Sequence, residues 1–402
     1  MDLRLSEEQT ALRETALAFL EEAYGPERLR EAMATPLGYD AALWRRIADE
    51  LGWPSLHLPE SAGGLGLGHV DLAVLLEVTG EALLCAPLFS TVALAANTLM
   101  AVGNARSEHD RLAAIAEGRT TATLALAERD GRWTTDAIAT TATPAASGWR
   151  LDGHKTWVVD GHAADLLLVA ARAPGSVGED GLSVFAIEPD RAGLRREALP
   201  TLDATRRLAE VELAGVRVGQ EDLVGEAEAA GPGIRRALDL AAIALAAEQL
   251  GGAQRCLDLA VAHAGERRQF GRPIGSFQAI QHRCADMYVA VEAARSAVYH
   301  AACLADGGGR TGGADTGAET LGTPPDEGDA DAVSTHAALC QAWCSEAYYH
   351  CAAECIQIHG GVGFTWEYDP HLHFKRARAS ESWLGEPAVH RERIARAIGL
   401  QE

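Results

Sequence analysis

The chain has 402 residues, of which 48% are hydrophobic, so it holds enough apolar side chains for two or three packed units. Its 57 Asp and Glu outnumber its 35 Lys and Arg, which gives a net charge of −22 at pH 7. Such a charge repels nucleic-acid backbones and anionic lipid surfaces, and the sequence therefore argues against nucleic acids and membranes as partners.

The N-terminal region is predicted to be helical over residues 1–119. Ser6 followed three residues later by Gln9 is a capping box, and apolar residues recur after it at helical spacing. Ser90 and Ser107 open further predicted helices, which stop at Gly103 and Gly118. The first segment is acidic and lacks a basic region followed by an apolar stretch, so we expect a cytoplasmic protein.

Residues 120–228 have the texture of a β domain. Short runs rich in Val, Leu and Thr follow one another closely without intervening helices, which favours an antiparallel barrel or sandwich. Asp152-Gly153 lies between two such runs, and this dipeptide predicts a two-residue hairpin turn.

Residues 229–402 return to long helices, predicted over 234–264, 276–304 and 332–358, and these lengths suit a helical bundle. Between the second and third helices, a Gly- and Asp-rich insert at about 306–330 has almost no apolar residue to bury, so we expect it to be disordered. The order helical, β, helical makes this an α+β chain.

The eight cysteines form no CxxC pair, so neither a zinc ribbon nor a disulfide framework is indicated. Four cysteines share one face of a predicted helix and three histidines lie nearby, which makes a metal site conceivable: Cys340, Cys344, Cys351, Cys355, His336, His350 and His359. Free cysteine more often packs as a small apolar residue, and we therefore expect no metal.

Two segments carry a family resemblance. ERRQFGRPIGSFQAIQHRCADM at 266–287 and CIQIHGGVGFTWEYDPHLHFKRA at 355–377 closely resemble the two C-terminal signatures of acyl-CoA dehydrogenases. The order and separation of the segments also match. The resemblance implies that family's fold over essentially the whole chain: an N-terminal helical domain, a middle antiparallel β-barrel domain and a C-terminal four-helix bundle.

In that family FAD lies between the β domain and the bundle, and its adenine and pyrophosphate end reaches the neighbouring subunit. The resemblance implies that one set of residues contacts the neighbour's cofactor: Arg267, Phe270, Gln278, Gln357, Ile358, His359, Gly360 and Gly361. A pyrophosphate favours a permanent cation such as arginine, and glycines let backbone N–H groups come close to its oxygens. Taken singly, each residue type has an ordinary structural role.

The segment HKTWVVDG resembles the part of the β domain that meets the flavin ring. This similarity places Trp157 where an aromatic side chain packs on the ring. The large polarizable face of Trp suits such stacking, although a Trp in a strand is as often part of the core.

The base that the family's reaction requires is missing from both of its usual positions. The reaction removes a proton alpha to a thioester while a hydride leaves the beta carbon for the flavin, and a Glu normally takes the proton. The resemblance places that Glu at Leu384, before Gly385, or at Ala241 on the first long C-terminal helix. Ala242 replaces an Arg that often contacts the substrate. Loss of a general base costs about 10²–10⁴ in rate, and we predict no catalytic residue here.

The residues that would serve this chain's own flavin are also altered. Val159 stands where a hydroxyl residue usually bonds near flavin N5, Ala127 stands where a Thr is expected, and RDGRW at 129–133 replaces a Gly- and Ser-containing stretch. Each missing hydrogen bond costs about 1 kcal/mol. The set for the neighbour's flavin is retained, whereas the set for the chain's own flavin and substrate is lost.

This pattern indicates a heteromer. Acyl-CoA dehydrogenases built from two unlike subunits occur among bacterial enzymes that act on steroid side chains, and the segments FTWEYDPHLHFKRA and WLGEP resemble theirs. The resemblance implies that this chain completes the FAD site of a paralogous catalytic subunit, in an α2β2 heterotetramer that oxidises an acyl-CoA.

Two alternatives stay open. A self-sufficient homotetramer would use a relocated base, and the nearest carboxylates are Glu248, Glu381 and Glu386. Their ordinary roles are, in turn, an arginine partner, a solvated side chain and a carboxylate at a helix N-terminus. The other alternative is a flavin-free scaffold or acyl-CoA-binding protein.

Overall fold

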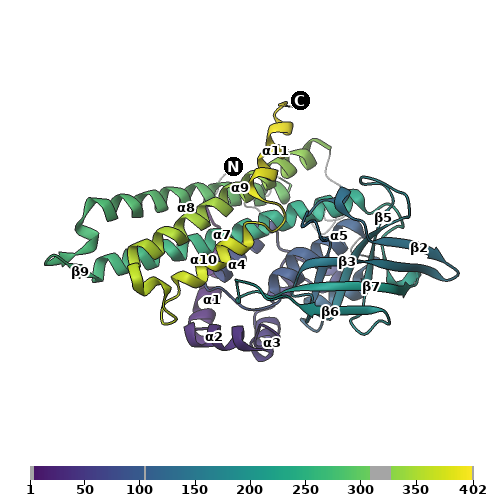
Figure 1. The fold of residues 1–402 in the computed structure, drawn as a ribbon, viewed down its shortest axis with the longest axis horizontal. Helices are drawn as coiled ribbons and strands as arrows, with labels where there is room; N and C mark the ends of the chain where they lie inside the picture. Colours follow the sequence, from purple (N-terminus) through teal and green to yellow (C-terminus); the bar gives the residue numbers. More distant parts are fainter. Residues whose placement is uncertain (1–3, 104–105, 308–326, 401–402) are drawn as a thin grey trace.

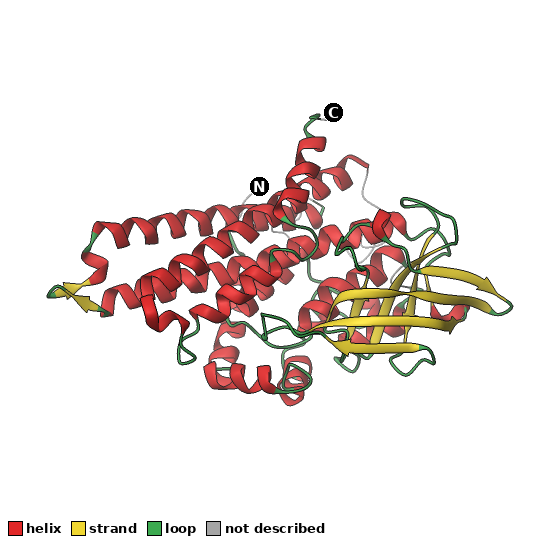
Figure 2. Ribbon diagram, viewed as in Figure 1, coloured by secondary structure: helices red, strands yellow, loops and turns green. Residues whose placement is uncertain are grey.

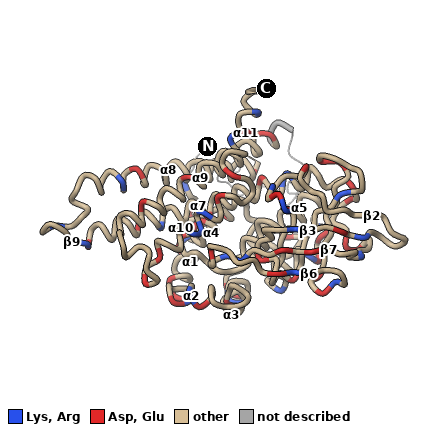
Figure 3. The backbone as a smooth tube through the Cα atoms, in the orientation of Figure 1, with Lys and Arg blue, Asp and Glu red and all other residues tan. Residues whose placement is uncertain are grey.

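The computed structural model describes residues 4–103, 106–307 and 327–400. Helices form one side of the molecule and a curved sheet forms the other (Figure 2). Lys and Arg are interspersed with Asp and Glu along the chain rather than gathered in one segment (Figure 3). Within the described ranges, none of the helices combines the length and apolar character that crossing a bilayer demands.

The N-terminal region is helical, as predicted. The capping box is complete, because the Ser6 hydroxyl accepts from the Gln9 N–H at 3.2 Å and the Gln9 side chain accepts from the Ser6 N–H at 3.0 Å. The helix predicted to open at Ser90 begins one residue earlier as a π-helical segment, η3 (Phe89–Ala96). The other helices of this region are α1 (Glu7–Ala23), α2 (Pro26–Ala34), α3 (Ala41–Asp49), α4 (His69–Glu81), α5 (Asn97–Val102) and α6 (His109–Ala116).

The middle region is a β domain of eight strands in one sheet. The strands are β1 (Ala122–Ala125), β2 (Thr141–Ala145), β3 (Gly148–Val159), β4 (Leu166–Arg172), β5 (Leu182–Ile187), β6 (Leu194–Ala198), β7 (Leu208–Val218) and β8 (Leu223–Val224). Their order is β6-β7-β3-β2-β4-β5-β8, with β1 beside β4. Residues on β4 alternate between two hydrophobic clusters, with Leu168 against the helices and Val169 inside the curved sheet.

The sheet is mostly antiparallel, as the sequence predicts, with two parallel contacts. β1 runs parallel to β4, and β2 meets β4 in a parallel bridge at Thr141 and Arg172. Parallel neighbours need a long connection. The connection between β1 and β4 contains the β2–β3 hairpin, which gives it that length.

The predicted turn at Asp152-Gly153 is wrong. β3 runs straight through this dipeptide, and the β2–β3 hairpin turns between Ala145 and Gly148 instead. Asp152 lies opposite a β-bulge in β7, where Gly215 has φ +68° and donates its N–H to the Asp152 carboxylate at 2.8 Å. Aspartate is common in turns, but here its carboxylate accepts the backbone N–H that the bulge leaves without a partner in the sheet.

The C-terminal region is the predicted helical bundle. Its helices are α7 (Gly231–Glu266), α8 (Gln278–Ala305), α9 (Glu327–His359), α10 (Pro370–Ser380) and α11 (Pro387–Ala397). Most of the predicted disordered insert lies outside the described residues. Its first residue, Asp306, is ordered and accepts the His69 and Val70 N–H groups at the start of α4.

Candidate functional site

The two signature segments meet at one end of the bundle. α7 leads into a hairpin of β9 (Arg268–Gln269) and β10 (Arg272–Pro273), which lies at the end away from the sheet (Figure 1). The rings of His263 on α7 and His359 on α9 stack with centroids 4.3 Å apart. Arg283 on α8 pairs with Glu354 on α9 at 2.9 Å. These contacts fix the three helix ends relative to one another.

The hairpin presents two of the predicted cofactor residues to solvent. Arg267 caps the C-terminus of α7, and its guanidinium makes no ion pair or hydrogen bond with any residue that the structure describes. Phe270 lies at the tip with φ +53° and is 91% exposed, with its ring edge against Phe277. Gln278 begins α8 and is exposed. An exposed aromatic ring beside an uncompensated cation is typical of a binding surface.

At the end of α9, some of the predicted cofactor residues are exposed to solvent and others are buried. Gln357 is exposed, whereas Ile358 and His359 are buried. Gly360 ends the helix with φ +66°, and no heavy atom lies within 4 Å of where a Cβ would stand on Gly360 or Gly361. The backbone of this Gly-Gly pair is therefore open to a ligand. Ile358 contributes to the set only through its backbone, because its side chain packs in the core.

His359 joins this surface to the interior of the bundle. Its Nδ1 lies 2.8 Å from the Cys355 carbonyl oxygen and 3.6 Å from the Cys355 Sγ. Burial lowers the pKa of His359, but the contacts with Cys355 outweigh it and leave the pKa above its ordinary value. The ring is thus held in one orientation beside Gly360.

Trp157 lies on β3 and points outward. Its backbone has φ +56°, in a stretch where the pairing of β3 with β7 slips between Lys155 and Val158. This bulge turns the indole outward, where it is 42% exposed. The RDGRW segment lies at its edge, since a Cβ on Gly131 would be 3.7 Å from the Trp157 Nε1.

Two positions near Trp157 carry no side-chain hydrogen-bond donor. Val159 and Ala127 are both buried and apolar. The Ala127 carbonyl accepts the Thr156 N–H at 2.9 Å, which joins the segment after β1 to β3. A flavin placed here would therefore receive no side-chain hydrogen bond from these two positions.

Both empty base positions are enclosed. Leu384 has φ +59°, precedes Gly385 with φ +111°, and is 7% exposed. Ala241 and Ala242 on α7 are buried in the same hydrophobic core as Leu384. No side chain at these positions can take up a proton.

Two of the three carboxylates nearest in sequence are engaged with arginines. Glu248 is buried and accepts from Arg206 Nη2 at 2.9 Å and from Arg376 Nη1 at 2.6 Å. This confirms its predicted role as an arginine partner. Glu381 is paired with Arg378 and only 19% exposed, so the prediction of a solvated side chain is wrong. Glu386 is exposed and occupies the N-cap of α11.

Arginine and aromatic side chains fill the space beside Leu384. The Arg206 guanidinium lies over the Phe89 ring at 5.0 Å and over the Trp383 ring at 5.3 Å. Arg376 extends the network, donating through Nε to Asp203 at 2.7 Å. Sequence reasoning missed Arg206 and Asp203. Arg376 lies within the second signature segment, which is the only signal that pointed to it.

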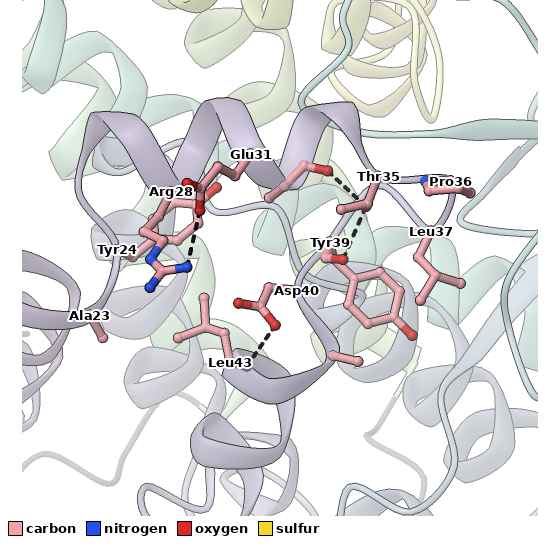
Figure 4. A pocket seen from close by; sticks show the side chains of 12 residues that line it. Ala23, Tyr24, Arg28, Glu31, Thr35, Pro36, Leu37, Tyr39, Asp40 and Leu43 are labelled. Atoms are coloured by element: carbon pink, nitrogen blue, oxygen red, sulfur yellow. Dashed lines mark hydrogen bonds and ion pairs between the residues drawn. The ribbon is translucent and has the colours of Figure 1, made fainter.

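Two pockets lie outside this region. One of about 540 Å³ is formed by the end of α1, by α2 and by the start of α3 (Figure 4). The other, about 460 Å³, borders the RDGRW segment at Glu128, Arg129 and Asp130. Neither is lined by Leu384 or Ala241. Among the described residues, no group of three or more His, Cys, Asp and Glu is arranged to hold a metal ion.

Family models match nearly the whole chain. The acyl-CoA dehydrogenase N-terminal domain matches residues 6–119, the middle domain matches 123–216, and the C-terminal domain matches 232–399.

Individual relatives are similar over almost their full length. The acyl-CoA dehydrogenase IpdE2 of Mycolicibacterium smegmatis is 36% identical over 97% of this chain and 98% of its own. The ChsE4-ChsE5 complex from Mycobacterium tuberculosis has a chain of the same fold with a TM-score of 0.85, 28% identity and full coverage of both chains. The Tcur3481-Tcur3483 steroid ACAD has a TM-score of 0.81 and 30% identity over 98% of both chains.

Proposed function

The chain belongs to the acyl-CoA dehydrogenase family, and from that premise we propose that it is the subunit that completes the FAD site of a catalytic paralogue. The enzyme is an oxidoreductase acting on the CH–CH bond of acyl-CoA thioesters, and its cofactor is FAD. When bound, FAD supplies the acceptor for the hydride. This chain contributes the surface for the nucleotide end, and the paralogue contributes the base.

The position of the Arg267 hairpin is the observation that carries the proposal. Arg267 and Phe270 lie at the end of the bundle away from the sheet, whereas Trp157 lies on the sheet (Figure 1). If FAD binds at this hairpin, its flavin ring therefore lies on the β domain of another chain. The guanidinium of Arg267, which pairs with none of the described residues, and the open backbone at Gly360 and Gly361 suit a pyrophosphate.

The interior of the chain supports a non-catalytic role. Leu384 and Ala241 are enclosed in the core, and Glu248 is held between two guanidiniums. Because both oxygens of this carboxylate are held by arginines, it is not free to reach the alpha proton of a substrate. Val159 and Ala127 offer no donor to a flavin on this chain's own sheet.

The partner in this proposal is a paralogous acyl-CoA dehydrogenase chain in an α2β2 heterotetramer located in the cytoplasm. Two of the similar solved structures are of paired chains, ChsE4-ChsE5 and Tcur3481-Tcur3483, the second described as a steroid ACAD. Exposed aromatic side chains beside the Gly-Gly pair provide apolar area for such a partner, with Phe364 at 66% and Trp366 at 59% exposure. A steroid-like acyl-CoA is the substrate class that we propose, because one of these structures is described as a steroid ACAD.

Co-expression with a paralogous dehydrogenase chain tests the proposal. The chain alone and the purified pair are assayed with a dye acceptor against short, long and steroid-like acyl-CoA thioesters. Turnover that is found in the pair and not in the single chain supports the proposal, whereas turnover by the single chain supports the homotetramer. A pair that forms but never carries flavin supports the scaffold.

A further inference from the structure

Four cysteines lie close together inside the bundle, one of them, Cys355, in contact with His359, and the proposed function uses none of them. Cys256 lies on α7, Cys284 on α8, and Cys351 and Cys355 on α9. All are free thiols, and only Cys284 is partly exposed. Cys284 interacts with Cys355, so the group extends from the core toward the surface.

The packing of α7 on α9 brings two of these thiols face to face. Gly252 on α7 lies against Tyr348 on α9, where a Cβ would come within 2.3 Å of the Tyr348 ring. One turn after Gly252 stands Cys256, and one turn before His359 stands Cys355. Further along the same two helices, the stacked rings of His263 and His359 form a second contact between α7 and α9. Cys256 and Cys355 lie between these two contacts, on facing helices and in the same buried cluster.

The two thiols differ in reactivity. The hydrogen bond from Cys256, helped by His359, outweighs burial and lowers the pKa of Cys355 to about 6. Burial raises the pKa of Cys256 well above its ordinary value, so Cys256 is the protonated member of the pair. A thiolate is the nucleophile in thiol oxidation, and a neighbouring thiol is the usual resolving group.

From this geometry we infer that Cys256 and Cys355 form a reversible disulfide that peroxide closes beside the nucleotide-binding end of the bundle. The Cys355 thiolate attacks hydrogen peroxide, an S–O bond forms, the O–O bond breaks, and hydroxide leaves and takes a proton to become water. The Cys256 sulfur then loses its proton and attacks the sulfenic acid, an S–S bond forms, and the S–OH bond breaks with release of a second water. Two thiols and one peroxide give one disulfide and two waters.

The bridge acts on the cofactor surface through His359. An S–S bond draws the Cys355 sulfur toward α7 and away from the His359 ring, which now lies 3.6 Å from it. His359 stands next to Gly360, in the surface that holds the cofactor's nucleotide end. This consequence rests on the proposed function, whereas formation of the bridge does not.

Peptide mapping of the full chain tests the bridge without a partner. The folded protein is treated with hydrogen peroxide, alkylated, digested without reductant and examined by mass spectrometry. We expect a Cys256–Cys355 cross-linked peptide that dithiothreitol reverses. Cys256→Ala and Cys355→Ala each remove it, and Cys344→Ala, a control at another buried cysteine of α9, leaves it intact. Near-ultraviolet circular dichroism checks that each variant is folded.

Peroxide-treated wild-type protein decides the matter even if a variant fails to fold. Cys256 and Cys355 both recovered as alkylated thiols, or Cys355 joined to Cys284 or Cys351, overturns the inference. In the co-purified complex, closing the bridge is expected to raise the Kd for FAD about fivefold, the equivalent of one lost hydrogen bond. An unchanged Kd with the bridge closed contradicts the link through His359 and leaves the proposed function standing.

Discussion

Arg376 and Glu248 form a buried ion pair in which the guanidinium Nη1 lies 2.6 Å from the carboxylate Oε1. The other oxygen of Glu248 takes Arg206, whose guanidinium lies over the rings of Phe89 and Trp383. The carboxylate thus links α7 to α10 and to the segment before β7. This arrangement makes Glu248 a structural residue in the region where a homotetramer would need its base.

Replacing Glu248 distinguishes a structural role for this residue from a role as the catalytic base. Glu248→Gln removes the charge between two buried guanidiniums, so the free energy of unfolding in urea is expected to fall by about 3–5 kcal/mol. Turnover per assembled complex is expected to stay within about threefold of wild type. Glu392→Gln, at an exposed pair with Arg396, is the control and changes stability by less than about 0.5 kcal/mol. A folded complex that loses turnover by about 10² or more identifies Glu248 as the base instead.

Arg267→Ala tests the cofactor surface. A charge-assisted hydrogen bond to phosphate contributes about 1.5–3 kcal/mol, so the complex is expected to bind FAD about 10–100-fold more weakly. Stability of the free chain does not change, because Arg267 has no partner among the described residues. The matched control is Arg268→Ala, the next exposed residue on the hairpin. Equal FAD affinity in wild type and Arg267→Ala, measured by fluorescence titration, contradicts the assignment.

Restoring a carboxylate at the empty position does not restore catalysis. Leu384→Glu places an ionisable group in an enclosed site beside Trp383 and is expected to lower stability by several kcal/mol. The single chain still lacks donors at Val159 and Ala127, so no acyl-CoA oxidation is expected. Leu384→Gln has a similar volume and no charge, so it separates the effect of altered packing on stability from the effect of the charge. Oxidation of an acyl-CoA by purified Leu384→Glu alone would show that the chain's own site is open.

Stability is expected to fall steeply below about pH 6.5. Burial lowers the pKa of His57 and His373 to about 3 and of His69 and His390 to about 4. At these four histidines the unfolded chain therefore binds more protons than the folded chain between about pH 4 and 6.5, and the stability that they contribute above this window is lost as the pH falls through it. Each histidine contributes up to about 1.4 kcal/mol per pH unit.

Urea unfolding at several pH values measures this slope. His390→Gln is expected to reduce the slope by about one proton, while the same change at exposed His109 leaves it unaltered. An identical slope in wild type and His390→Gln would show that His390 is not held neutral in the folded chain.

The features predicted from the sequence are those set by local chemistry. The Ser6 capping box and the bundle helices depend on residues a few positions apart. Asp152-Gly153 misled the prediction because a turn and a bulge opposite Gly215 favour similar residues. The order of the strands and the parallel β1–β4 pair depend on tertiary packing, which local patterns do not encode.

The buried charge network was beyond sequence reasoning for a related reason. Arg376 meets Glu248 across 128 positions and Asp203 across 173, so no local spacing links them. Arg267, Phe270 and Gly360 were found only through the family signatures. Their exposure leaves them accessible to a cofactor bound by the proposed partner.

The ratio of FAD to polypeptide tests the division of labour most directly. The chain is purified alone and with its paralogue, flavin is measured by absorbance, and subunits are counted by native mass spectrometry. We predict no flavin on the single chain and one FAD per pair of unlike chains in the complex. One FAD on every copy of the purified single chain, together with acyl-CoA oxidation, would contradict the account.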